Sequence, residues 1–174
     1  MAKTGKHLFA LPAELRNQIY QLVLVVNTPI VIDTDPTATL PHLLAVSSQI
    51  RQEARGIYYI ENKFHLRVRD FNARAYLPWV QMAEPFWAKA PHNPMKWALT
   101  TSGPHWENLK AWLEIAHKDT RWAMIHTGGH SEIRILCGAS DVVVALRDKP
   151  WSVVEAILPG IREMLASQDQ GWMD

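Results

Sequence analysis

The chain has 174 residues, of which 48% are hydrophobic and 20% charged, a balance typical of a globular protein and not of a disordered or fibrous one. The 18 Lys and Arg residues nearly balance the 17 Asp and Glu residues, which excludes the strongly basic surface of a dedicated nucleic-acid or anionic-membrane binder. The single cysteine, Cys137, excludes an internal disulfide. The aliphatic runs 22–26 and 142–146 are too short to span a bilayer, so we expect neither a nucleic acid nor a membrane as partner.

No export signal is predicted near the N-terminus. The apolar stretch 8–12 is far shorter than a signal-peptide core, and the acidic Glu14 is atypical of a transit peptide. We therefore expect an intracellular protein, cytoplasmic or nuclear.

The first predicted element is an amphipathic helix that ends before Asn27. Pro12 suits the first turn of a helix, and Glu14 suits its positive end. Aliphatic residues recur at helical spacing along it, namely Leu11, Leu15, Ile19, Leu22, Val23 and Val26.

A strand, a helix and a second strand follow in the first half of the chain. The β-branched run 30–32 predicts a short strand, and residues 40–60 carry apolar side chains on one helical face. Residues 64–68 alternate between apolar and basic side chains, which predicts a half-buried strand.

The second half is rich in tryptophan, since all eight of them lie beyond residue 70. Residues 71–90 are weakly helical, and 106–118 show clear helical periodicity. The segments 133–137 and 142–146, separated by a Gly-Ala-Ser-Asp sequence, predict a β-hairpin. A helix from residue 151 should be kinked or split at Pro159-Gly160, and residues 168–174 should be frayed.

Two segments resemble a known family. They are LFALPAELRNQIY at 8–20 and LLAVSSQIRQEAR at 43–55, the latter followed by IYYIENKF at 57–64. Together they resemble the two-EXR domain, common in filamentous fungi, whose two Glu-x-Arg triplets stand here at 14–16 and 53–55. The opening Leu-Pro-x-Glu also resembles an F-box, a family that docks on the Skp-type adaptor of a cullin ubiquitin ligase. The resemblance covers residues 1–70.

The two triplets suggest an interaction between the helices that carry them. Residues two apart on a helix point to different sides, so neither triplet can close an ion pair within itself. Pairing of Glu14 with Arg55 and of Arg16 with Glu53 would use both charges of each triplet and fix the register of the helices. Such pairs could form a structural clamp or a charged docking edge for a partner.

No metal site, cofactor or catalytic group is predicted. His126 and His130 have the i,i+4 spacing of a helical metal pair, but Gly128 and Gly129 between them break such a helix. Cys137, on an apolar strand, is expected to be an inert buried thiol. Phosphate loops, nucleophile elbows and paired-carboxylate motifs are missing from the sequence.

The tryptophan-rich half allows three interpretations. Its aromatic residues could form a core, a partner surface or a pocket for a small apolar ligand. The candidate pocket residues are Trp106, Trp112, Trp122, His117, His126 and His130.

From these patterns we predict an α+β fold in a single domain, 1–174, in which the motif region 1–70 and the Trp-rich half 71–174 share one core. A helical pair with an F-box-like motif would pack with a small, largely antiparallel sheet and with further C-terminal helices. The predicted function is a non-catalytic protein interaction module, a candidate ubiquitin-ligase-type adaptor that binds a Skp-type protein. The candidate partner-binding residues are Leu11, Pro12, Glu14, Arg16, Ile19, Glu53 and Arg55. The alternative is a small-molecule-binding protein or cofactor-free enzyme with a Trp- and His-lined pocket in 71–174.

Overall fold

A computed structural model describes residues 8–33, 40–87, 89–90, 95–124 and 131–173. The chain divides into two compact units, one comprising residues 1–67 and 77–98 and the other 68–76 and 99–174. The chain therefore passes from one unit to the other three times, whereas a division into the halves 1–70 and 71–174 would need a single passage. The expectation of one core shared by the two halves stays a prediction.

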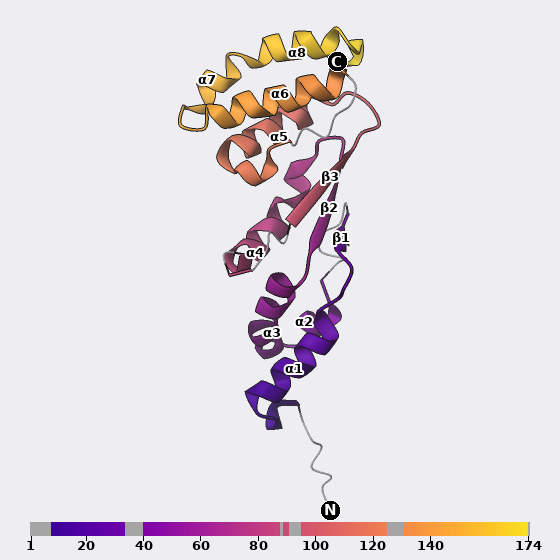
Figure 1. The fold of residues 1–174 in the computed structure, drawn as a ribbon, viewed down its shortest axis with the longest axis vertical. Helices are drawn as coiled ribbons and strands as arrows, with labels where there is room; N and C mark the ends of the chain where they lie inside the picture. The colour runs from indigo at the N-terminus through magenta and orange to yellow at the C-terminus, as the bar shows by residue number, and fades with distance from the viewer. Residues whose placement is uncertain (1–7, 34–39, 88, 91–94, 125–130, 174) are drawn as a thin grey trace, which may run out of the picture. The chain divides into compact units, whose positions relative to one another are not determined.

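The sheet is parallel, so the expected largely antiparallel sheet is wrong. Strand β1 (Ile30–Ile32) pairs with β2 (Phe64–Arg69), with Ile30 opposite Phe64 and Ile32 opposite Leu66 (Figure 1). Strand β3 (Met95–Thr100), which the sequence did not predict, lies on the other side of β2. Helices connect each strand to the next, and such crossovers return the chain to begin the next strand in the same direction.

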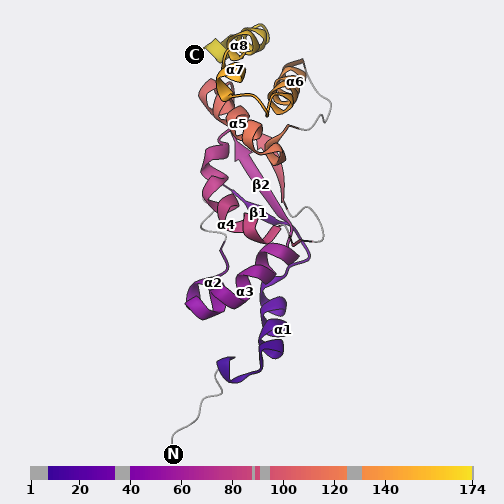
Figure 2. The ribbon, with the colours of Figure 1, turned by 90° about the vertical axis from the view of Figure 1, so that its left-hand side faces the viewer.

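In the first unit, the two motif segments form three helices together with their neighbouring residues. Helix α1 (Ala13–Leu24) packs on α3 (Ser48–Glu61), and the short α2 (His42–Val46) precedes α3 (Figure 2). The helix predicted over 40–60 is interrupted at Ser47, whose backbone is extended and whose hydroxyl accepts a hydrogen bond from the Ile50 N–H. Ser47 therefore caps α3 and separates it from α2.

Aromatic rings fill the centre of the first unit. Phe64 of β2 meets Tyr58 of α3 edge to face, with ring centroids 5.3 Å apart, and lies 5.0 Å from Trp79. Trp79 belongs to α4 (Leu77–Trp87), which packs on α3 and contacts it again through Tyr59. These contacts hold α3 against both β2 and α4.

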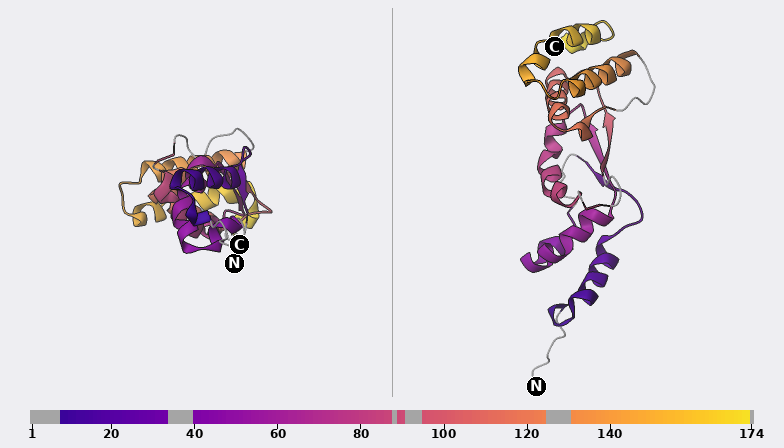
Figure 3. Two further views of the ribbon diagram at one scale, coloured as in Figure 1. Left: turned by 90° about the horizontal axis from the view of Figure 1, so that it is seen from below. Right: turned by 60° about the vertical axis from the view of Figure 1, so that its left-hand side comes forward.

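The second unit is helical, and the predicted β-hairpin is wrong. Residues 133–137 and 142–145 lie in one helix, α6 (Ser131–Ala145), which runs beside α5 (Trp106–Lys118) and α8 (Leu158–Ala166) (Figure 3). Burial along α6 recurs at Leu136, Ser140 and Val143, which is helical spacing, whereas Ile133 and Val142 are exposed. Gly138, expected in the hairpin turn, is an interior residue of this helix.

The predicted fraying over 168–174 is wrong for the described residues 168–173. After α7 (Trp151–Glu155) and α8, a 3₁₀ turn at Gln170–Met173 buries Trp172. The Trp172 indole N–H donates to Glu132 over 2.8 Å, and its carbonyl accepts from Arg162. The expected break near Pro159 falls just before α8, so that Pro159 lies in the first turn, where its missing N–H costs nothing.

Across the described residues, every helix is too short or too polar to traverse a membrane.

The helical assignment of 131–145 predicts the effect of Gly138→Ala. A Cβ at Gly138 would meet no atom within 4 Å, and the position lies inside a helix, where alanine is favoured over glycine. The substitution should raise the free energy of unfolding by about 0.5–1 kcal/mol in urea denaturation. A hairpin turn with Gly138 in the left-handed region would instead make the alanine variant less stable.

Candidate functional site

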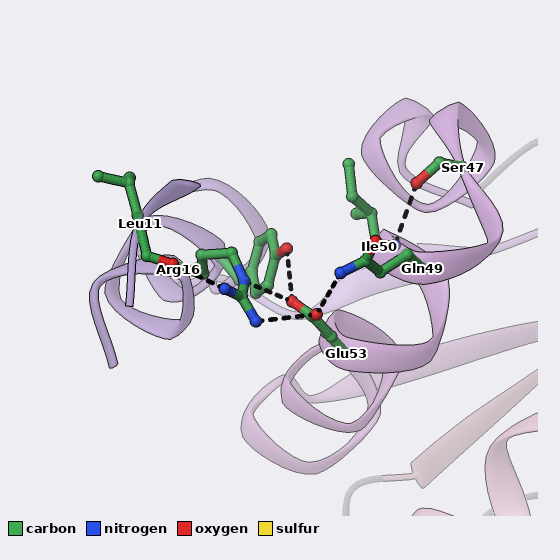
Figure 4. A network of polar contacts seen from close by, with 7 residues as sticks. Leu11, Arg16, Ser47, Gln49, Ile50 and Glu53 are labelled. Carbon is green, nitrogen blue, oxygen red and sulfur yellow. Dashed lines mark hydrogen bonds and ion pairs between the residues drawn. The ribbon is translucent and has the colours of Figure 1, made fainter. Parts of the chain in front are cut away.

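The pairing of the two Glu-x-Arg triplets is confirmed for Arg16 and Glu53. Arg16 donates from Nε to Glu53 Oε2 over 2.8 Å and from Nη2 to Oε1 over 3.0 Å (Figure 4). This two-pronged geometry joins α1 to α3, and the two side chains are only 16% and 24% exposed. Arg16 also donates from Nη1 to the Leu11 carbonyl, just before α1 begins.

Glu53 is the centre of this network. Besides Arg16, it accepts hydrogen bonds from the Tyr20 hydroxyl (2.9 Å) and from the Gln49 side-chain amide (3.1 Å). Hydrogen bonding by Arg16, reinforced by Gln49 and Tyr20, lowers the pKa of Glu53 to about 2. Burial, together with the neighbouring Glu53 carboxylate, raises the pKa of Tyr20. Because these charges are used within the unit, the arrangement favours the clamp interpretation over a charged docking edge.

Glu14 and Arg55, the other predicted pair, are both exposed, and within the described part of the chain no ion pair joins them. The Arg55 guanidinium instead lies over the ring of Phe86 in α4, 5.3 Å from its centroid. One of the two expected cross-helix pairs thus forms.

Asn62, which the sequence did not single out, anchors the other end of α1. Its fully buried side chain donates to the carbonyls of Leu24 and Tyr58, each over 2.9 Å, and accepts from the Val26 N–H. The amide therefore satisfies backbone groups that the end of α1 leaves without helical partners. A single asparagine carries too weak a sequence signal for this role, because its partners lie 36 and 38 residues away.

These two anchors turn the aliphatic stripe of α1 outward. Tyr20 and Leu24 are buried towards the unit's interior, whereas Leu22 is 85% exposed and Val23 58%. The exposed side chains of the stripe are Leu15, Leu22, Val23 and Val26, with Ile19 half-buried among them. We call this set the α1 stripe; its members at 15, 19 and 22 share one side of the helix, and Val26 follows just after the helix ends at Leu24.

Leu11 and Pro12 are at the start of the same helix. Leu11 is half-buried and Pro12 exposed, as a docking role at these positions requires. Leu11 and Pro12 thus lie just before α1 and Ile19 lies within it, all three at least partly accessible, while Arg16 and Glu53 lie at the contact of α1 with α3.

The described residues of the alternative pocket are buried or half-buried in the second unit and contact one another or their neighbours there. Trp112 and Trp122 are fully buried, with rings perpendicular at 5.6 Å, and the Trp112 indole N–H donates to the Trp122 carbonyl. His117 is buried, bonds the Leu146 carbonyl and contacts the ring of Trp151. Trp106 is half-buried beneath the Arg162 guanidinium. His126 and His130 lie outside the described residues.

Cys137 is buried in α6 and not on a strand. Burial, with a smaller contribution from Asp141, raises the pKa of its thiol, which disfavours the reactive thiolate. In the part of the chain that the structure describes, no cluster of three or more His, Cys, Asp or Glu side chains could hold a metal ion.

One polar cluster went unnoticed in the sequence because its members are far apart along the chain. Asp70, in the left-handed region with φ of 48°, accepts hydrogen bonds from the Ser102 N–H (2.6 Å) and hydroxyl (3.1 Å), and His105 lies 3.6 Å away. Ser102 donates directly to the carboxylate and not to the imidazole, so the histidine is not placed as its base. Asp70 instead holds the strained turn after β2 against the segment that follows β3.

The Arg16–Glu53 contact predicts a pH-dependent stabilisation. Since the pKa of Glu53 falls from 4.5 to about 2 on folding, its contribution should be complete above about pH 4.5 and decline as the pH falls towards 2. Urea denaturation between pH 2 and 6 should therefore show a shallower acid loss of stability in Glu53→Gln than in the parent chain.

A double-mutant cycle with Arg16→Gln and Glu53→Gln should give a favourable coupling energy. The matched cycle with Glu14→Gln and Arg55→Gln should give a coupling close to zero. Equal couplings in the two cycles, or an unchanged acid profile in Glu53→Gln, would contradict the clamp.

Comparisons of this chain with protein-family models, with curated proteins and with solved structures give no match. Any functional inference therefore has to come from the residues and their geometry.

Proposed function

We propose that the protein is a non-catalytic interaction module that docks a protein partner on the outer side of α1. The observation that carries this proposal is the α1 stripe, since its aliphatic side chains are exposed on a helix that Arg16 and Asn62 fix in place through other groups. Exposed apolar side chains that gather on one helix can mark an interaction site.

The partner that the proposal names is a Skp-type adaptor, which gives the protein a role as a ubiquitin-ligase-type adaptor in the cytoplasm or nucleus. Support comes from the F-box-like sequence around Leu11, Pro12 and Glu14, all of which are exposed or half-buried at the start of α1. An amphipathic helix bound in a groove presents residues at i, i+4 and i+7, and the stripe offers this spacing at Leu15, Ile19 and Leu22.

The structure gives no comparable support for the alternative pocket in the second half. Trp112 and Trp122 are packed against each other, and His117 is hydrogen-bonded to the backbone. We therefore do not propose a ligand pocket built from these residues.

Leu22→Gln tests the docking face. Because Leu22 is 85% exposed, the change should leave the melting temperature nearly unchanged, whereas loss of an apolar anchor should weaken binding about tenfold or more. The measurement is calorimetric titration of the purified chain with a purified Skp-type adaptor.

Val142→Gln is the matched control, because Val142 is an exposed aliphatic residue on α6, in the other unit. It should bind the adaptor like the parent chain. Failure of the parent chain to bind the adaptor would reject the partner, and equal binding by Leu22→Gln and the parent would reject the docking face.

A further inference from the structure

A surface cavity in the first unit lies away from the α1 stripe. Its volume is about 390 Å³, within the usual range for small-molecule sites. Residues from α2 and the segment before it, from α3 and from α4 line it: Leu40, Leu44, Ala45, Arg51, Arg55, Tyr59 and Met82. The floor is thus aliphatic and aromatic, and the charged members are both arginines.

The two guanidinium groups lie on one side of α3, since Arg51 and Arg55 are four residues apart. Arg51 is held in place by its Nε, which donates to the Leu44 carbonyl over 2.8 Å. Arg55 is held over the Phe86 ring, which in turn stacks on Tyr59 with centroids 5.5 Å apart. Both cations are therefore positioned by contacts that leave donor groups for another acceptor.

Neither arginine is neutralised by the walls of the cavity. Its lining contains no Asp or Glu, and among the described residues neither Arg51 nor Arg55 forms an ion pair with a carboxylate. An anion placed there would accept charge-assisted hydrogen bonds, which are stronger than neutral ones.

A second cavity, in the other unit, shows the contrast. It has a similar volume of about 370 Å³, but its lining cations face acids: Lys110 pairs with Glu155 over 2.6 Å, and Arg74 lies 4.0 Å from Glu114. The cations of the second cavity are thus paired with acids of its own lining, whereas the two arginines of the first cavity are not.

We propose that the cavity between α2, α3 and α4 binds a small organic anion with an apolar body, of the medium-chain carboxylate class. The ligand's carboxylate would bind Arg51 and Arg55, and its alkyl chain would lie on Leu44, Tyr59 and Met82. This site is separate from the docking face, so the two proposals stand or fall independently.

Calorimetric titration of the full chain with decanoate tests the site, with decanamide as a neutral ligand of the same length. Decanoate should bind more tightly than decanamide. Arg55→Gln should weaken decanoate binding about fivefold or more, because it removes one cation while keeping a polar, hydrogen-bonding side chain at that position. Met82→Glu should abolish binding, because it places a carboxylate on the cavity wall.

Arg134→Gln, which removes an exposed arginine on α6, is the matched control and should bind like the parent chain. Arg55 and Met82 are themselves exposed, so both variants should fold, and thermal unfolding without ligand verifies this. If one of the two variants does not fold, decanoate binding by the other variant tests the site.

Absence of decanoate binding to the parent chain, binding equal to that of decanamide, or unchanged binding in a folded cavity variant overturns the proposal. Decanoate binding by Leu22→Gln would be unaffected whether or not the docking face is real.

Discussion

The orientation of α1 depends on the carboxylate of Glu53. By gathering Arg16, Tyr20 and Gln49 on its two oxygens, it fixes which side of α1 meets α3. Asn62 holds the C-terminal end of α1 in a similar way, through hydrogen bonds to backbone groups of Leu24 and Val26. With both ends held by directional polar contacts, α1 cannot roll to bury its aliphatic side without leaving these groups unpaired, which is costly away from water. The exposed α1 stripe is thus a consequence of polar anchoring.

The sequence was informative where a local pattern agrees with the tertiary structure. The local patterns predicted helix α1, strands β1 and β2, helix α5 and the Arg16–Glu53 contact. The contact could be predicted because neither Glu-x-Arg triplet can pair its charges within its own helix. The direction in which the α1 stripe faces did not follow from its periodicity, since an aliphatic stripe commonly faces the core. Here the buried side is the one with Tyr20 and Leu24.

The incorrect predictions have physical causes. Short apolar runs such as 133–137 suit a strand and a buried helix equally well, and only the burial at Leu136, Ser140 and Val143 distinguishes them. Strand direction is set by the crossover helices and not by the strands themselves, so the parallel sheet could not be inferred from alternation at 64–68. The arginine-lined cavity assembles residues from 40 to 82, a combination that no linear motif records.

The central claim is that the aliphatic side of α1 faces outward, and cysteine labelling tests it most directly. Cys137 is the chain's single cysteine and is buried, so it serves as an internal slow reference. Under native conditions at neutral pH, Leu22→Cys should react with a maleimide at a rate close to that of an unstructured peptide thiol, whereas Leu24→Cys, at a position only 2% exposed in the parent chain, should be protected. A thiol at position 22 as protected as Cys137 would contradict the orientation of α1 described here.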